Sequence, residues 1–362
     1  MNIFLLTETA SGCYKWRGAI PAKYLRRRGH DVQIFSDDSL EAKAPDVVVF
    51  YRAHYPEAVK LMAWCKRNHI RTMFDTDDAL DLVPRENLNY AAVQTRLKLY
   101  WELLGSADVV TTTTDTLAAH LRRSNPNVVV VPNSVDPEEW RVQPRVPGVR
   151  VGWTGSPTHF LDLVVALDAI RELQRSIDFT FVLQGICLEP TLDELYKELL
   201  THHGKQFFET AVGRGIKHFM TKLSGIRYEF HPNVPIEQHA GKVSDLALDI
   251  GIAPLTADPF NHHKSCIKYY EYAMSGAATV ASRVLPYSTE VPFTAKNNRE
   301  SWKQKLGEVL DADRETLWRE QRDWVLAHRN IETNVAMWER VLDGAGDAGA
   351  DQLSEELCLH PR

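Results

Sequence analysis

The feature that most constrains the fold is a repeated alternation of short apolar segments with helix-like ones. In the first half of the chain the apolar segments lack a polar face, and they cover residues 3–6, 32–35, 46–50, 71–75, 109–111 and 128–131. Helical patterns lie between several of them, at residues 20–28, 58–68 and 116–123. Short strands that are apolar on both faces and joined by helices are typical of a parallel sheet covered on both sides.

The same pattern begins again after a connector that contains Pro137, Pro144 and Pro147. Expected strands in this second half cover residues 149–153, 179–183, 226–230, 248–253 and 278–281. The sequence therefore predicts an α/β protein with two doubly wound Rossmann-like domains, residues 1–147 and 148–325, and a cleft between them. We expect a C-terminal helical tail, in which residues 326–343 pack back on the first domain and residues 344–362 are disordered.

Length and composition agree with this division and exclude several classes of protein. A chain of 362 residues exceeds the size at which a single core stops growing, about 250–300 residues. A net charge of −6 gives no global indication of nucleic-acid binding. Five cysteines without metal-site spacing predict reduced thiols and a cytoplasmic protein. No apolar run is long enough to predict a transmembrane segment.

The stretch 258–282 contains the strongest candidate for a ligand site. A polar loop with His262, His263 and Lys264 precedes a helix for which Ser265 is the expected N-cap. The free amide groups at such a helix start favour a phosphate, and they belong to Cys266, Ile267 and Lys268. Glu271, one turn further along, is placed to accept hydrogen bonds from a sugar hydroxyl. The alternative is an ordinary surface helix with a charged first turn.

Loops that follow other strands add further candidates, because ligands of parallel sheets bind beyond the carboxyl ends of the strands. Gly12 lets the backbone approach a ligand, although its loop lacks the GxGxxG pattern of nicotinamide sites. Gly155 and Ser156 form a second candidate phosphate loop without the lysine of a P-loop. His159, in the same loop, is either a ligand contact or a helix cap.

Three carboxylates, Asp75, Asp77 and Asp78, follow the expected strand 71–75. They are suited to binding a cation, holding an acceptor hydroxyl or acting as a base. They are equally compatible with a helix cap and a solvated acidic turn. We expect no dedicated metal site, because no second cluster of ligands accompanies them.

The two-domain pattern resembles the GT-B fold of nucleotide-sugar glycosyltransferases. Residues 264–276 (KSCIKYYEYAMSG) are similar to the donor-site motif of the retaining family-four-type enzymes, the glycosyl transferases group 1. Three shorter matches occur in the same order as in that family, at residues 29–32, 132–136 and 152–156.

This resemblance implies a hexosyltransferase-like enzyme that moves a sugar from a nucleoside-diphosphate sugar to an acceptor hydroxyl with retention, and needs no other cofactor. The first domain is then the acceptor domain and the second the nucleotide-sugar domain. Glu271 matches the glutamate that holds the ribose. The amides of Cys266, Ile267 and Lys268 match those that hold the diphosphate, and Gly12 matches the loop near the donor phosphate and sugar.

The sequence departs from the family at two points. His263 occupies the position of the first glutamate of the motif, so we expect His263 or Asp258 to replace its contact with the sugar. The basic pair after the first strand of the second domain is missing, and Lys264 and Lys268 are expected to supply that charge. The resemblance leaves the donor phosphate or Asp77 as the group that deprotonates the acceptor.

The acceptor stays open at this point: a saccharide, a small molecule or a modified DNA base. A phage-type glycosyltransferase acting on nucleic acid is an alternative, for which the basic segments at residues 26–28 and 214–222 leave room. A catalytically inactive sugar-nucleotide-binding protein is another, because of His263. A sugar-nucleotide epimerase would share the fold.

Overall fold

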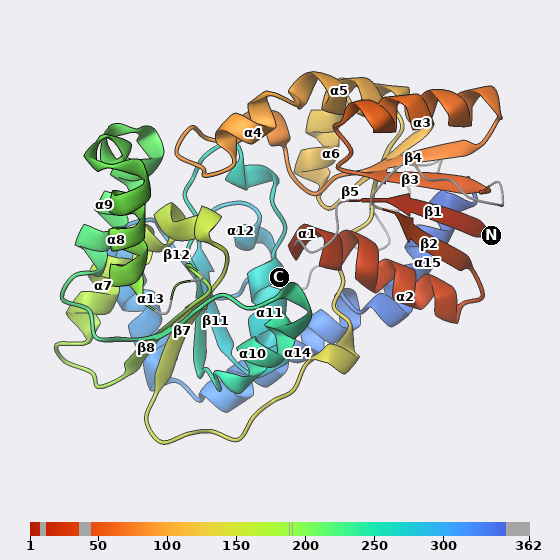
Figure 1. Cartoon of the computed structure of the whole chain (residues 1–362). Coiled ribbons are helices and arrows are strands. Elements are labelled where there is room, and N and C mark those ends of the chain that lie inside the picture. Colours follow the sequence, from red (N-terminus) through yellow and green to blue (C-terminus); the bar gives the residue numbers. More distant parts are fainter. Residues whose placement is uncertain (8–11, 36–44, 188, 190, 345–362) are drawn as a thin grey trace.

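The computed structural model describes residues 1–7, 12–35, 45–187, 189 and 191–344. Two parallel sheets of six strands each form two domains that lie side by side (Figure 1). The first sheet has the order β2-β1-β3-β4-β5-β6. Its strands are β1 (Asn2–Leu6), β2 (Asp31–Phe35), β3 (Val47–Tyr51), β4 (Arg71–Asp75), β5 (Val109–Thr112) and β6 (Val128–Val130).

Helices cover both faces of this first sheet, which explains why its strands are apolar on both sides. One face, with Phe4, Val48 and Phe50, packs against α3, α5 and α6, whereas the other, with Ile3 and Val49, packs against α2 and α15. The first-domain helices are α1 (Gly12–Tyr14), α2 (Ile20–Arg27), α3 (Pro56–Arg67), α4 (Tyr90–Gln94), α5 (Leu97–Ser106) and α6 (Asp115–Leu121).

The second sheet has the order β12-β11-β10-β7-β8-β9. Its strands are β7 (Arg150–Thr154), β8 (Thr180–Gln184), β9 (Tyr228–His231), β10 (Ile250–Ala253), β11 (Ala278–Ser282) and β12 (Thr294–Ala295). The order reverses between β7 and β10, so the crevice in which ligands of such sheets bind lies at the carboxyl ends of these two strands. The loops that follow them are those that the sequence singled out, at residues 154–159 and 254–266.

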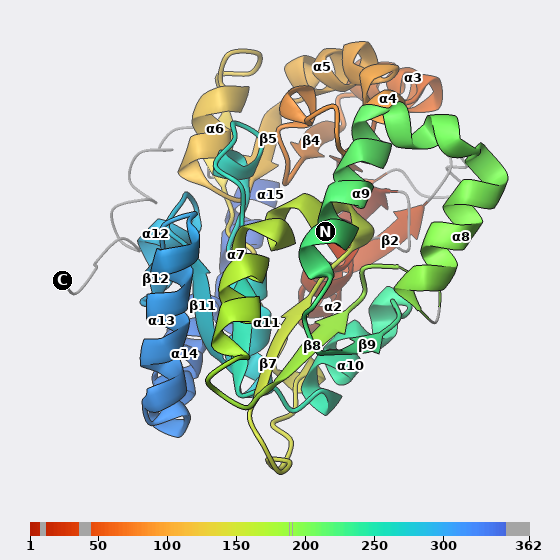
Figure 2. The same ribbon diagram turned by 90° about the vertical axis from the view of Figure 1, so that its left-hand side faces the viewer.

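Among the helices of the second domain, α7 packs against both α9 and α13. The helices that follow the connector are α7 (Phe160–Leu173), α8 (Leu192–His203), α9 (Ala211–Leu223), α10 (His239–Asp245), α11 (Ile267–Ser275), α12 (Tyr287–Glu290), α13 (Arg299–Asp311) and α14 (Arg314–His328) in the second domain, and α15 (Ile331–Leu342), which packs on the first. Figure 2 shows α13 and α14 beside β11, at the edge of the sheet opposite to α8.

The C-terminal helices connect the two domains. Asn330 forms a parallel bridge with Val135, and α15 packs along α2. The Trp338 ring lies 4.5 Å from the guanidinium carbon of Arg17, and Arg71 Nη2 donates to Val341 O at 3.2 Å. After α14 the chain thus leaves the second domain, and α15 packs against the first. A disordered tail was expected at the C-terminus, but residues 345–362 lie outside the described residues.

The structure differs from the sequence-based expectation at one helix start and adds two elements that were not predicted. The first helical segment begins at Gly12 rather than near residue 20, because a π-helical turn at Lys15–Ala19 joins α1 to α2. Helix α9 was not predicted, since Gly213 and Gly215 lower its helix propensity, yet both are buried at packing contacts. Strand β12 has only two residues, too few for a pattern to form.

The described residues contain no helix with the length and apolar character needed to cross a membrane. The four cysteines among them, Cys13, Cys65, Cys187 and Cys266, are all free thiols.

Candidate functional site

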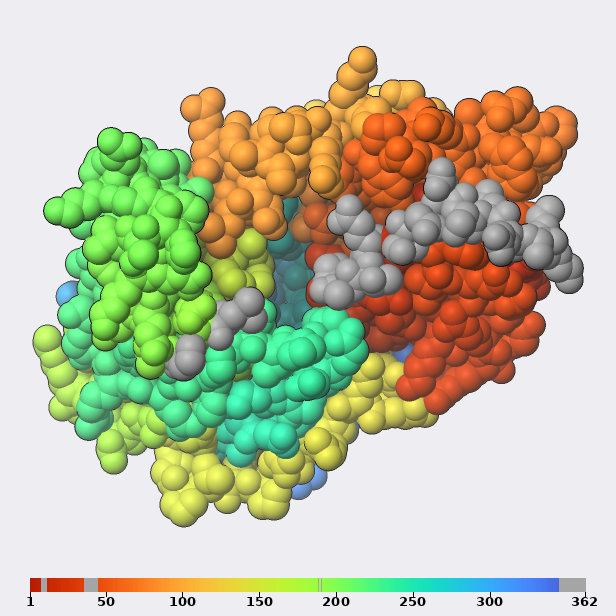
Figure 3. Space-filling view, in the orientation of Figure 1, coloured from red at the N-terminus to blue at the C-terminus, as the bar shows by residue number. Residues whose placement is uncertain are grey.

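A cavity of about 1190 Å³ opens between the carboxyl edges of the two sheets (Figure 3). Loops from both domains line it, so residues far apart in the sequence face one space. Among the predicted site residues, the cavity is lined by Gly12, Asp77, Gly155, Ser156, Asp258, Lys264, Ser265, Ile267, Lys268 and Glu271. The structure therefore brings most of the candidates together.

The amino end of α11 opens toward this cavity. The helix begins at Ile267, with Cys266 as its N-cap residue and without a side-chain cap. The expectation that Ser265 caps the helix was wrong, since its Oγ instead accepts a hydrogen bond from Asn133 Nδ2 of the first domain at 2.8 Å. The helix ends as predicted at Gly276, which has a left-handed backbone with φ of 92°. With no side chain capping the first turn of α11, its amide groups remain available for an anion.

Lys268, on the first turn of α11, packs closely against the end of β7 and the loop that follows it. Its Nζ donates to Thr154 O at 2.6 Å and lies 4.9 Å from the centre of the Trp153 ring. Burial lowers the pKa of Lys268, and the nearby Glu271 only partly offsets this. A Cβ atom at Gly155 would lie 2.6 Å from that Nζ and 2.7 Å from the Trp153 ring. Gly155 is therefore the residue that leaves room for the lysine.

We expect Gly155→Ala to weaken the binding of the nucleoside diphosphate that the sequence predicts here by about 10- to 100-fold, because the methyl group displaces Lys268 from its place at the cavity wall and a lost charged contact costs about 1.5–3 kcal/mol. Isothermal titration calorimetry measures the change. Gly307→Ala is the matched control, since nothing lies within 4 Å of a Cβ at that position on α13. It should bind the nucleoside diphosphate as the wild type does, and an equal loss in both variants would contradict the role given to Gly155.

Glu271 is buried, with 5% of its surface exposed, and its Oε1 pairs with Nε2 of His239 at 3.0 Å. Burial alone would raise the pKa of Glu271, but the attraction of His239 and Lys268 outweighs it and lowers the pKa below its usual value. The carboxylate is therefore ionised. Its second oxygen accepts no hydrogen bond from any residue that the structure describes, so it is free to accept one from a ligand.

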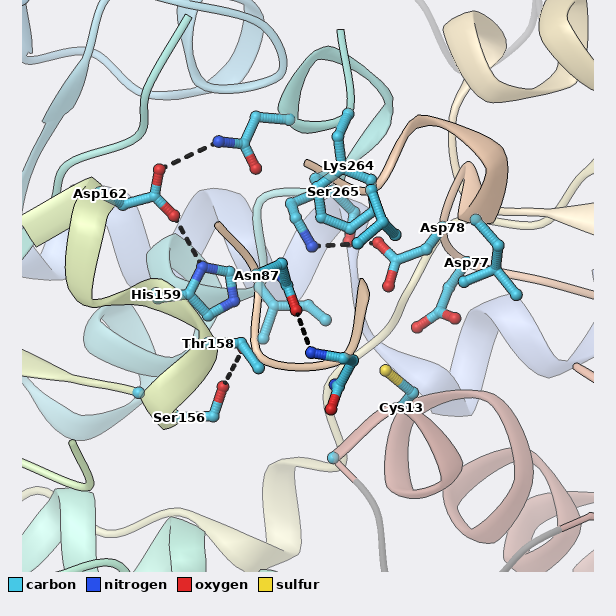
Figure 4. Close-up of a pocket in the computed structure, with 18 of the residues that line it drawn as sticks. Cys13, Asp77, Asp78, Asn87, Ser156, Thr158, His159, Asp162, Lys264 and Ser265 are labelled. Atoms are coloured by element: carbon cyan, nitrogen blue, oxygen red, sulfur yellow. Dashed lines mark hydrogen bonds and ion pairs between the residues drawn. The ribbon is translucent and has the colours of Figure 1, made fainter. Parts of the chain in front are cut away.

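A cluster of charged groups forms the opposite wall of the cavity (Figure 4). Nη1 of Arg52 lies 3.0 Å from Cys13 Sγ, 3.3 Å from Asp77 Oδ1 and 3.4 Å from Asp78 Oδ2. Lys264 reaches across from the second domain, with its Nζ 3.0 Å from Asp78 Oδ1. Arg52 also has a positive φ of 45°, a strained backbone of the kind found at functional sites.

The pKa values of the two aspartates in this cluster shift in opposite directions. Burial raises the pKa of Asp77, and the negative charge of Asp78 raises it further. The attraction of Arg52 lowers this pKa, but not enough to cancel the increase. Burial has the same tendency at Asp78, but Lys264 and Arg52 outweigh it and lower that pKa. Asp77 is therefore the stronger base of the two, and Asp78 holds its negative charge more firmly.

Cys13, Asp77 and Asp78 place their ligand atoms within 4.8 Å of one another, a spacing that a metal ion could use. The guanidinium of Arg52 contacts all three groups and already brings positive charge to this place. The third carboxylate of the predicted trio, Asp75, is not at the cavity. It forms a buried, two-pronged ion pair with Arg17 at 2.7 and 3.1 Å, so both residues serve the interior of the first domain.

Two of the predicted catalytic residues are engaged in local structure. The ring of His263 lies outside the cavity lining, 4.9 Å from the ring of His120, and its Nδ1 donates to Pro259 O at 2.6 Å. Asp258 lines the cavity, but its carboxylate accepts from Asn261 N at 2.9 Å and Thr256 Oγ1 at 2.7 Å. His263 thus docks its loop on the first domain, and Asp258 shapes that loop.

Cys266 also departs from the simplest picture of the site. Its side chain is buried and 1% of the residue is exposed, so only its backbone is placed to contribute to the helix start. Arg52 and His239 were not predicted as site residues. Each acts through a partner distant in the sequence or in another element, which local patterns do not reveal.

No protein-family model and no curated protein matches this sequence. Solved structures do resemble it. An alpha-glucosyltransferase (AGT) in complex with UDP superimposes with a TM-score of 0.64 and 11% identity over 94% of this chain and 99% of that one. HepE (Alr3699) from Anabaena, in complex with UDP and glucose, has a TM-score of 0.62 and 11% identity, with the same coverage of 94% and 99%.

A glycosyltransferase from Rickettsia africae gives a TM-score of 0.61 and 13% identity over 95% of this chain and 98% of that one. At such low identity the likeness concerns the fold rather than the activity. The superpositions cover nearly the whole of both chains, so the likeness extends over both domains. The chain therefore has the GT-B fold of glycosyltransferases, with two Rossmann-like domains, as its sequence pattern predicted.

Proposed function

We propose that this protein is a glycosyltransferase that moves a sugar from a UDP-sugar to an acceptor hydroxyl. One observation carries the proposal: a single cavity joins an uncapped helix start, two lysines and an ionised glutamate to a carboxylate cluster on the facing domain. The first group suits a nucleoside diphosphate, and the second suits a hydroxyl that must lose a proton. The complexes of AGT and HepE with UDP support uridine as the base.

In this proposal the diphosphate lies at the start of α11. The amides of Cys266, Ile267 and Lys268 donate to its oxygens, and the side chains of Lys264 and Lys268 add two positive charges. The free oxygen of Glu271 accepts from the ribose hydroxyls. Gly12, Gly155 and Ser156 border the cavity where small side chains leave room for phosphate and sugar.

The reaction forms a bond between the acceptor oxygen and the anomeric carbon while the bond from that carbon to the phosphate oxygen breaks. The electron pair of the broken bond remains on the phosphate, so negative charge grows beside Lys264, Lys268 and the helix start. Groups fixed there before the reaction stabilise this charge more in the transition state than in the ground state. The acceptor proton passes to a phosphate oxygen of the leaving group or to Asp77, and the resemblance of residues 264–276 supports retention.

The basic segments do not favour a nucleic-acid acceptor. Arg26 donates to Val32 O, Arg27 pairs with Glu138 at 2.8 Å and Arg28 pairs with Glu339 at 2.7 Å. Lys222, in the other basic segment, pairs with Asp168 at 2.5 Å. Arg214 donates to Glu209 O, and Lys217 is the one lysine or arginine of the two segments for which no partner is described. One such charge does not make the row of free charges that a phosphate backbone requires. We therefore favour a saccharide or small-molecule acceptor.

Thermal unfolding with a panel of nucleoside diphosphates tests the proposed nucleotide site. UDP at 100 times its Kd should stabilise the protein by about 2.7 kcal/mol, while equal concentrations of GDP and ADP should have less effect. Release of UDP from labelled UDP-glucose then separates a transferase from an inactive binding protein, because a working transferase slowly hydrolyses its donor without an acceptor. The absence of stabilisation by UDP and by UDP-sugars would contradict the proposal.

A further inference from the structure

A histidine and an aspartate that the proposed mechanism has not yet used lie on the cavity wall beside the two lysines. His159 follows β7, and its Nδ1 lies 2.8 Å from Oδ2 of Asp162 on the first turn of α7 (Figure 4). The other oxygen of Asp162 accepts from Thr256 N at 2.8 Å, Thr256 Oγ1 at 2.7 Å and Asn261 Nδ2 at 3.0 Å. The carboxylate is thus held in place by three donors.

These contacts determine which ring nitrogen of His159 carries the proton. The attraction of His159 and the hydrogen bonds from Thr256 outweigh burial and lower the pKa of Asp162, so this carboxylate is ionised and only accepts. Nδ1 of His159 must therefore donate to it. The neutral ring then carries its lone pair on Nε2, and this atom makes no hydrogen bond to any residue of the described ranges. His159 lines the cavity and 22% of its side chain is exposed, so a ligand in the cavity can reach the ring.

Charged groups of both signs surround the ring. Asp162 on α7 and Asp78 after β4 are negative, whereas Lys264 before α11 and Lys268 on α11 are positive. Burial, together with the two lysines, outweighs Asp162 and lowers the pKa of His159. In the ligand-free protein the ring is therefore neutral near pH 7.

We propose that His159 takes up a proton at Nε2 when the diphosphate of the nucleotide sugar binds, and then donates this N–H to a phosphate oxygen. The inference rests on the proposed function, which puts the diphosphate beside Lys264 and Lys268. The negative charge of the diphosphate offsets the repulsion of the lysines and makes the charged ring favourable. The imidazolium becomes a third positive group beside the oxygen that receives the electron pair, and Asp162 keeps the ring oriented toward it.

The sign of the pH dependence follows from this uptake. Binding raises the pKa of His159, so the added affinity is present at low pH and is lost as pH rises through the pKa of the bound state. The affinity for a UDP-sugar should consequently fall between about pH 7 and the alkaline range, where histidine no longer holds the proton.

Isothermal titration calorimetry with UDP-glucose, in buffers of different ionisation enthalpy, counts the protons taken up. UDP-glucose is the probe because, unlike UDP, its phosphates hold no proton near neutral pH. We expect uptake approaching one proton per bound ligand near pH 7 in the wild type. His159→Gln keeps an N–H near the position of Nε2 but cannot gain charge, and should show no uptake and a flatter pH profile.

His218→Gln, on the exposed face of α9, is the control and should match the wild type. Binding of UDP-glucose to the wild type without proton uptake would overturn the inference and leave the proposed function standing, and it needs no variant to be observed. Equal uptake in His159→Gln would also overturn it. Failure of the wild type to bind either UDP or UDP-glucose would overturn the proposed function, and this inference with it.

Discussion

Lys268→Met should lower the turnover of UDP-glucose by about 100- to 1000-fold, the loss typical of removing one group that stabilises charge in a transition state. The lysine lies at the start of α11, held by Thr154 O and the Trp153 ring. There its charge acts in a buried place where water screens little. In the proposed reaction it faces the oxygen that receives the electron pair.

The same substitution should leave the fold intact. Burial lowers the pKa of Lys268, so the folded protein holds the charge at a cost rather than depending on it. Methionine fills the volume of the lysine stem with apolar atoms. The pattern to expect is thus a large loss of turnover with little change in the unfolding temperature, which is typical of a functional charge.

Initial rates of UDP release at saturating UDP-glucose measure this effect, with thermal unfolding recorded on the same samples. Lys305→Met is the control, because Lys305 lies on α13 and pairs with Glu308 at the surface. It should keep wild-type turnover. If Lys268→Met retained turnover within about threefold, less than 1 kcal/mol, the start of α11 would not be the diphosphate site.

Much of this site could be predicted from the sequence because its main parts are local. Lys268 and Glu271 are three residues apart on one helix, so they share a face wherever the helix lies. The loops after β7 and β10 meet because parallel strands end at the same edge of a sheet. These two regularities explain why Gly155, Lys268 and Glu271, each of which the sequence singled out, line one cavity.

The parts that could not be predicted depend on contacts between distant residues. Glu271 forms a hydrogen bond with His239, which lies 32 positions away in the sequence, and Lys264 forms one with Asp78, 186 positions away. The periodicity of apolar residues along the sequence does not predict such pairs. The lowered pKa values of Glu271 and Asp78 nevertheless depend on them. Asp75 is a case in which a local pattern was misleading. Its place in an acidic run suggested a site at the surface, but it forms a buried ion pair with Arg17.

His263 and Ser265 point away from the positions expected for them because the helix starts later than the sequence predicted. A short 3₁₀ turn at Asn261–His263 precedes α11, and the helix starts two residues after Ser265. The ring of His263 consequently faces His120, and the hydroxyl of Ser265 faces Asn133. Both residues connect the two domains, which gives the loop before the helix a docking role that a motif alignment would not indicate.

Glu271→Ala should weaken the binding of UDP about 10- to 100-fold, because a hydrogen bond to a charged group contributes about 1.5–3 kcal/mol. The carboxylate is ionised, and one of its oxygens is free of hydrogen bonds from the described residues. In the proposed complex that oxygen accepts from the ribose. The substitution should therefore remove only the hydrogen bonds to the ribose hydroxyls, and the contacts of the diphosphate with α11 should remain.

A comparison of UDP with an analogue that lacks the ribose hydroxyls isolates this contact. The wild type should prefer UDP, whereas Glu271→Ala should bind both ligands with similar affinity, as measured by calorimetry. Glu237→Ala, which removes an exposed carboxylate on the neighbouring turn Ile236–Gln238, should keep the wild-type preference. A preference for UDP that survives in Glu271→Ala would show that the ribose is held elsewhere, and would remove the glutamate from the nucleotide site while leaving the helix start in it.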